Sequence, residues 1–191
     1  MSSNSWQTLG TGKVLGYLRP DLTSASSSVW VLGPWIDAFF AEVLLSLPAA
    51  VDLRVVTRPP YQASSSFREH GIAARARLDE RPNTTVRVLA NLHAKLVIID
   101  EQVVYCGSAN WYRFSLEESR ELVLRGPVVS AIGLMDEVQV IWDEATQEGF
   151  PHAPVKSQST ADGYMKEVID PIAEAKLREV PGSFVLKRPL R

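Results

Sequence analysis

Short apolar runs separated by Gly, Pro and Ser clusters recur along the first half of the chain. The run at 29–32 suits a buried strand, and the residues at 51–56 alternate well enough for a second strand. Apolar residues at helical spacing over 36–47, and an Arg-rich stretch over 67–81, predict a helix after each of these strands. The chain is therefore expected to begin with a strand–helix–strand–helix pattern.

Strands dominate the pattern that follows. Four more strands are predicted, at 85–89, 95–99, 103–106 and 121–124. Asp100 and Glu101 are placed to form a hairpin turn between two of them, and a long amphipathic helix is expected over 127–145. This order of elements predicts an α/β sandwich in which a mixed central sheet is flanked by helices.

The composition changes close to residue 150. Pro and Ser clusters over 151–160 are typical of a linker, and one more helix is predicted over 164–178. The residues at 185–191 include three basic side chains and no acidic one. We therefore expect one catalytic domain over 1–149 and a C-terminal extension over 150–191.

Composition narrows the class of protein. With 191 residues, 46% hydrophobic and 22% charged, the chain suits one folded domain and not a disordered segment. Its 20 basic and 22 acidic residues create no global attraction to nucleic acid, although residues 51–95 carry eight basic against four acidic side chains. That local excess marks either an anion-binding region or a solvated helix face. One cysteine, Cys106, and no visible signal peptide or membrane span predict a cytoplasmic protein.

The strongest chemical signal is the spacing HxKx4Dx6GSxN, formed by His93, Lys95, Asp100, Gly107, Ser108 and Asn110. A chance match of six fixed positions is expected about once in 10⁵ to 10⁶ chains of this length. On one face of a strand, the His93 imidazole can attack phosphorus while the Lys95 ammonium holds a non-bridging oxygen. The Asn110 amide can donate to the same oxygens, and the Ser108 hydroxyl can either do likewise or fix the turn.

This spacing resembles the HKD motif of the phospholipase D superfamily, and the chain is most similar there to small bacterial nucleases with one motif per chain. The resemblance implies a phospholipase D-like fold and a phosphodiesterase, expected to be an endonuclease, that forms a phosphohistidine without a metal or cofactor. It also implies an acidic residue that orients the histidine: Glu121 matches, with Glu117 and Glu118 as competitors. Asp100 is interpreted as structural support for the site, with direct catalysis as the alternative.

The resemblance also bears on partners. The chemistry uses two histidines, but neither His70 nor His152 belongs to a second HxK pair, so a homodimer is expected to supply the second motif. Some relatives of this kind sit beside helicases or in phage-defence systems, which makes a helicase or antiviral defence complex a further expected partner. Nucleic acid is the expected substrate, with DNA or RNA, single or double strand, left open. A phospholipid substrate and a catalytically silent nucleic-acid-binding subunit are the alternatives.

Four residues are candidates for binding the substrate. Gly107 belongs to the motif and Trp111 follows it directly, and Arg54 and Arg58 lie in the basic central segment, where they can bind a phosphate backbone. Trp111 and the aromatic residues after it either stack on bases or pack in the core. Trp35, after the first predicted strand, is expected in the core.

Overall fold

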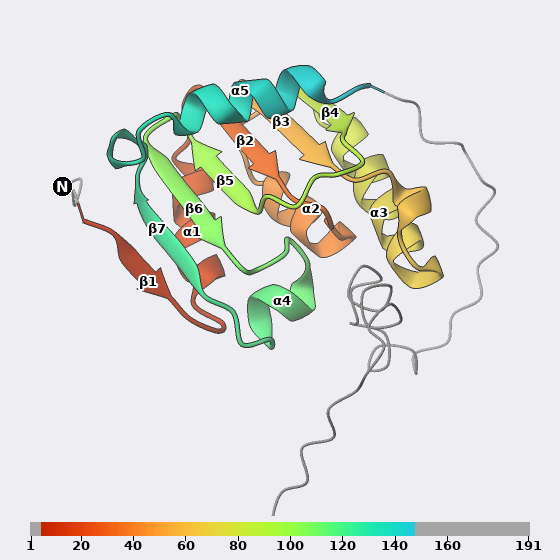
Figure 1. Ribbon diagram of the computed structural model, residues 1–191, viewed down its shortest axis with the longest axis horizontal. Coiled ribbons are helices and arrows are strands. Elements are labelled where there is room, and N and C mark those ends of the chain that lie inside the picture. The colour runs from red at the N-terminus through yellow and green to blue at the C-terminus, as the bar shows by residue number, and fades with distance from the viewer. Residues whose placement is uncertain (1–4, 148–191) are drawn as a thin grey trace, which may run out of the picture. The chain divides into compact units, whose positions relative to one another are not determined.

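The fold is built around one mixed β-sheet (Figure 1). The computed structural model describes residues 5–147, so the predicted extension over 150–191 lies outside the described residues. Seven strands in this part of the chain form the order β1-β7-β6-β5-β2-β3-β4. Their bounds are β1 Gln7–Leu9, β2 Ser28–Leu32, β3 Asp52–Thr57, β4 Thr84–Val88, β5 Leu96–Ile99, β6 Val103–Gly107 and β7 Val123–Pro127.

The sheet has a parallel half and an antiparallel half. β2, β3 and β4 pair in parallel, joined by crossovers that contain the helices predicted from the sequence. β5, β6, β7 and β1 are antiparallel to their neighbours, and β5 lies against β2 where the two halves meet. The predicted α/β sandwich with a mixed sheet is therefore confirmed.

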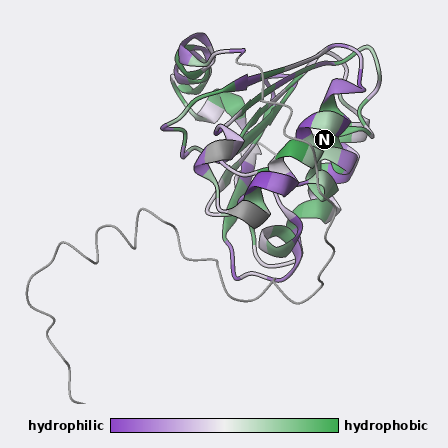
Figure 2. Ribbon diagram, turned by 90° about the vertical axis from the view of Figure 1, so that its right-hand side faces the viewer, coloured by the Kyte–Doolittle hydropathy of each residue, from purple (hydrophilic) through white to green (hydrophobic). Residues whose placement is uncertain are grey.

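Helices cover both faces of the sheet. Their bounds are α1 Val14–Thr23, α2 Ala38–Leu44, α3 Ser65–Asp79, α4 Arg113–Glu117 and α5 Leu134–Glu144. Side chains alternate along β2, so Val29 and Val31 pack under α1, α2 and α3, whereas Trp30 and Leu32 pack under α5. Figure 2 shows this layering, with several helices on one side of the strands and one on the other.

Two stretches differ from the sequence prediction. The helix expected over 127–145 is wrong in its first half: β7 runs to Pro127, and Gly133 has a φ of 78°, which an α-helix does not accommodate, so α5 begins at Leu134. The helix α1 was not predicted; it contains Pro20, and its buried side chains recur every four residues. β1 and α4, which have three and five residues, are too short for a periodic signal.

Candidate active site

The two halves of the HxKx4Dx6GSxN spacing meet at the open end of the β5–β6 hairpin. Leu96 at the start of β5 pairs with Cys106 near the end of β6, and Gly107 pairs with Val123 of β7. Leu96 also pairs with Leu32, the last residue of β2. The site therefore lies where β2 and β6 end and β5 and β7 begin, beside α4 in Figure 1.

His93 and Lys95 form a close pair. The Nζ atom of Lys95 lies 3.4 Å from Nε2 of His93 and donates to the His93 carbonyl oxygen at 3.2 Å. The strand predicted from Lys95 begins one residue later, so both side chains belong to the segment that leads into β5. The expectation that they share one face still holds. An imidazole nitrogen beside an ammonium group can place a nucleophile and a cation on the same phosphate.

Glu121 joins the turn of residues 107–110, here called the GSAN turn, to α4 and β7. Its two carboxylate oxygens accept hydrogen bonds from the hydroxyls of Ser108 and Ser115, the latter at 2.7 Å. Ser115 in turn accepts from the backbone N–H of Asn110 at 3.0 Å, and Ser108 accepts from that of Leu122 at 3.1 Å. The Ser108 hydroxyl is thus engaged with a carboxylate, which favours its role in fixing the turn. The role of Glu121 toward His93 stays a prediction.

Ser115 is the residue that sequence reasoning missed. Its side chain is 1% exposed and bridges the turn of residues 107–110 to Glu121, yet it belongs to no spacing pattern. Close by, the Asn110 Oδ1 atom is buried and accepts no hydrogen bond from the described residues. A buried acceptor without a donor is costly, so this amide has hydrogen-bonding capacity that a bound molecule or second chain can satisfy.

Asp100 lies at the opposite end of the hairpin. It adopts a φ of 52° in the turn with Glu101, which confirms the predicted turn, and its carboxylate accepts hydrogen bonds from the serines at 26–28. Burial alone would raise the pKa of Asp100, but these bonds, led by the one from the Ser27 N–H, lower it to about 2. The four extended residues of β5 lie between it and Lys95, which places the two roughly 16 Å apart. The structure therefore supports the structural interpretation of Asp100.

Gly107 and Trp111 have packing roles. A Cβ atom at Gly107 would lie 2.1 Å from the backbone oxygen of Leu122, so only glycine fits there. Trp111 is fully buried, donates from Nε1 to the Leu32 carbonyl at 2.8 Å and stacks on Phe40. Its assignment to substrate binding is corrected accordingly, because a ring enclosed in the core has no face free for a base.

The two arginine candidates lie in different places. Arg54 pairs with Asp52 at 2.7 Å and covers the Trp30 ring on the α5 side of the sheet. Arg58 instead donates from Nε to the Leu92 carbonyl at 2.6 Å, immediately before His93. Arg58 therefore borders the motif, whereas Arg54 belongs to the packing under α5.

Much of the basic excess over 51–95 is neutralised within the fold. Arg75 pairs with Asp79, Arg77 pairs with Glu42, and the buried Arg81 donates to several backbone carbonyls. Across residues 5–147, no group of three or more His, Cys, Asp or Glu side chains is arranged to hold a metal. In the same part of the chain, no helix is both long and apolar enough to cross a bilayer.

The family is shown by sequence comparison. The pattern described as "Cardiolipin synthase, PLD-like domain" matches residues 18–139, which is more than half of the chain. The chain therefore belongs to the phospholipase D superfamily of phosphodiesterases, as the motif resemblance implied.

Two curated relatives are cardiolipin synthases. Cardiolipin synthase A of Pseudomonas putida is 30% identical over 150 residues, which cover 73% of this chain and 28% of that protein. Cardiolipin synthase A of Pseudomonas entomophila is 32% identical over 111 residues, 53% of this chain and 22% of that protein. The chain thus spans less than a third of the length of these relatives.

Two solved structures match over almost their whole length. NucT from Helicobacter pylori superposes with a TM-score of 0.62 at 19% identity, covering 74% of this chain and 98% of NucT. Nuc from Salmonella typhimurium, a phospholipase D family member, gives 0.59 at 17% identity, covering 74% and 97%. At these identities, the likeness shows the fold.

Proposed function

We propose that this protein is a nuclease that cleaves phosphodiesters through a phosphohistidine. The observation that carries the proposal is the pairing of His93 Nε2 with Lys95 Nζ at 3.4 Å, beside the turn that holds Asn110. In the proposed first step, Nε2 attacks phosphorus and the bond from phosphorus to the leaving oxygen breaks. Lys95 and the Asn110 amide stabilise the charge on the non-bridging oxygens, which is the task a metal performs in other phosphodiesterases.

A second imidazole completes the proposed reaction. It gives a proton to the leaving oxygen, then takes one from the water that hydrolyses the phosphorus–nitrogen bond and releases His93. His70 lies within α3 and belongs to no HxK pair in the sequence, and His152 lies outside the described residues. A second copy of the chain is the proposed source, with Glu121 accepting an imidazole N–H to hold the reactive tautomer. A monomeric solution mass together with full activity would contradict this scheme.

A nucleic acid is the proposed substrate because the chain is similar to Nuc and NucT over nearly their entire lengths. The second candidate is a phospholipid, which is favoured by the 30% identity with a cardiolipin synthase. The fold and motif serve both, so the choice has to come from substrate assays.

The deciding experiment compares wild type, His93→Ala and His70→Ala in excess EDTA. Substrates are labelled single-stranded DNA, duplex DNA, RNA, phosphatidylglycerol vesicles and the reporter bis(p-nitrophenyl) phosphate. We expect wild type and His70→Ala to cleave a nucleic acid and the reporter, and His93→Ala to cleave neither. Turnover of the vesicles alone would establish the lipid candidate, and equal activity of His93→Ala would remove His93 as nucleophile.

A further inference from the structure

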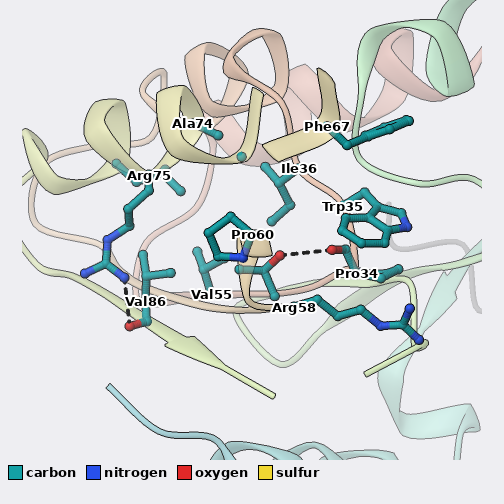
Figure 3. A pocket seen from close by; sticks show the side chains of 13 residues that line it. Pro34, Trp35, Ile36, Val55, Arg58, Pro60, Phe67, Ala74, Arg75 and Val86 are labelled. Atoms are coloured by element: carbon teal, nitrogen blue, oxygen red, sulfur yellow. Dashed lines mark hydrogen bonds between the residues drawn. The ribbon is translucent and has the colours of Figure 1, made fainter. Parts of the chain in front are cut away.

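A row of aromatic side chains runs along one side of the catalytic motif. The Tyr112 and Phe67 rings lie 5.5 Å apart at 74°, and Phe67 and Trp35 lie 5.8 Å apart at 44°. The guanidinium carbon of Arg58 lies 5.7 Å from the Trp35 ring centre. These four residues, here called the aromatic row, are each only partly buried. Figure 3 shows Phe67, Trp35 and Arg58 together at one end of a small pocket.

Both ends of the aromatic row touch the motif. At one end, the Tyr112 N–H donates to the carbonyl of Asn110 at 3.0 Å, and burial raises the pKa of the Tyr112 phenol while Asn110 partly lowers it. At the other end, Arg58 donates to the carbonyl of Leu92, the residue before His93. A polymer held at His93 and Asn110 therefore has the aromatic row beside it.

The row is fixed before any ligand arrives. Asp37, two residues after Trp35, caps α2 through the Phe40 N–H at 2.8 Å and accepts from the Arg113 N–H, next to Tyr112, at 2.9 Å. One carboxylate thus ties the segment of Trp35 to the segment of Tyr112. Rings held in place lose little entropy on binding, which favours their use as a contact surface.

The pocket beneath the row is too small to be the ligand site. Its volume is about 30 Å³, which leaves room for no more than a few water molecules. It is lined by Ile36, Val55, Pro60 and Ala74, among other residues, as Figure 3 shows. A ligand must therefore lie over the exposed rim formed by Trp35, Phe67 and Arg58.

The charge at the rim is positive. Arg58 uses Nε for the Leu92 carbonyl, and no carboxylate pairs with its guanidinium within the described residues. Its terminal nitrogens are therefore available to bind an anion. Aromatic faces next to an available guanidinium are the combination with which proteins bind stacked bases and the phosphates between them.

We infer that the aromatic row binds single-stranded nucleic acid next to the scissile phosphate. Bases stack on Trp35 and Phe67, and Arg58 holds an adjacent phosphate. In a duplex, the bases are paired and stacked on one another, so these rings contact them only after unpairing. The inference rests on the proposed nuclease function and deepens it by naming single strands as the substrate class.

Binding to the catalytically blocked His93→Ala protein tests the row separately from the chemistry. Fluorescence anisotropy with a short labelled oligothymidylate is compared with an abasic strand of equal length and with a duplex. We expect the oligothymidylate to bind most tightly. Adding Trp35→Leu or Phe67→Leu should weaken its binding roughly 5- to 100-fold, with little change for the abasic strand, because only base stacking is lost.

Three matched variants sharpen the test. Trp35→Phe keeps a ring and should retain most of the binding, and Tyr17→Leu, which removes a partly exposed ring from α1, should leave binding unchanged. Arg58→Gln should weaken binding to both strands and flatten its salt dependence, since it removes a phosphate contact. Thermal unfolding of each variant checks that it folds.

The possible failures are distinguishable. Equal affinity for oligothymidylate and abasic strand, or no effect of Trp35→Leu, would overturn the aromatic row as a base-binding site even if the reporter is still cleaved. Binding to phosphatidylglycerol vesicles provides a second comparison. If Trp35→Leu or Phe67→Leu weakens binding to these vesicles but not to oligothymidylate, the row binds lipid and the inference is overturned. Failure of wild type to cleave any diester would instead refute the proposed function, while the affinity ratios would still test the row.

Discussion

At the closed end of the β5–β6 hairpin, Asp100 accepts hydrogen bonds from the serines at 26–28; at the open end, Glu121 accepts them from Ser108 and Ser115. The two carboxylates have similar partners but different surroundings. Asp100 joins the hairpin turn to the start of β2, with every bond internal to the fold. Glu121 is linked through Ser115 to the backbone N–H of Asn110, whose side-chain amide oxygen is buried without a donor among the described residues.

We propose that only one of these two carboxylates, Glu121, takes part in the chemistry. Asp100 belongs to the HxKx4Dx6GSxN spacing but is bonded to the serines at the start of β2, whereas Glu121 stands outside that spacing and is held at the turn of Asn110. Substitutions at the closed end should therefore change stability, and substitutions at the open end should change rate. The predictions below test that division.

The largest effect is expected from Glu121→Gln. If the carboxylate orients and balances the imidazole, its loss should lower kcat roughly 10²- to 10⁴-fold, while oligonucleotide binding changes little. Steady-state kinetics on the cleaved nucleic acid measures the effect. Glu118→Gln, which removes an exposed carboxylate from the same segment, is the control and should retain wild-type kcat. Equal effects of both substitutions would break the assignment of Glu121.

Ser115→Ala should follow with a loss in kcat of roughly 10- to 100-fold, as is typical when a residue that orients a reacting group is removed. It leaves the Asn110 N–H and one oxygen of Glu121 without their partner. Because Ser115 positions other groups, the loss should appear in kcat and not in KM, and the pH–rate profile should shift. Ser119→Ala is the control in the same segment. Lower stability of Ser115→Ala with an unchanged kcat of the folded enzyme would assign Ser115 to folding only.

Contacts between segments that adjoin in the sequence could be predicted, whereas contacts between distant segments could not. The hairpin places the segment of His93 and Lys95 beside the turn that holds Asn110 through strands that adjoin in sequence, so a spacing of eighteen residues was enough to predict that the two segments meet. Trp111 and Tyr112 could not be told apart, because consecutive extended residues point in opposite directions and only the packed neighbours decide which enters the core. The Trp35–Phe67 contact joins two distant segments and leaves no mark in the spacing of either.

At the closed end, Asp100→Asn should cost about 1–3 kcal/mol of unfolding free energy near neutral pH and leave the activity of the folded enzyme intact. The folded-state pKa of about 2 lies below the ordinary value of 3.8. The stabilisation by Asp100 is therefore complete above the ordinary value and is lost as pH falls from about 4 to about 2. Urea unfolding across this range should show the wild type converging on Asp100→Asn.

Glu101→Gln provides the control for that measurement. Glu101 is the other turn residue, also with a positive φ, at 55°, and it is exposed. Its neutralisation removes the same charge without removing the bonds from the serines. If Glu101→Gln lowers the unfolding free energy as much as Asp100→Asn does, or if the loss caused by Asp100→Asn does not depend on pH, then the negative charge of the turn and not the hydrogen bonds stabilises the hairpin.

The smallest effects come from deleting one hydroxyl at each end. Ser27→Ala removes a 2.9 Å bond to Asp100 but keeps the bond from the Ser27 N–H. It should therefore lower the unfolding free energy by about 0.5–1.5 kcal/mol and leave kcat unchanged. Ser108→Ala removes the corresponding bond to Glu121 and should lower kcat severalfold at a similar cost in stability. Unfolding and kinetics are measured on both variants. If Ser27→Ala slows the fully folded enzyme as much as Ser108→Ala does, the closed end is coupled to catalysis and the division between the two carboxylates fails.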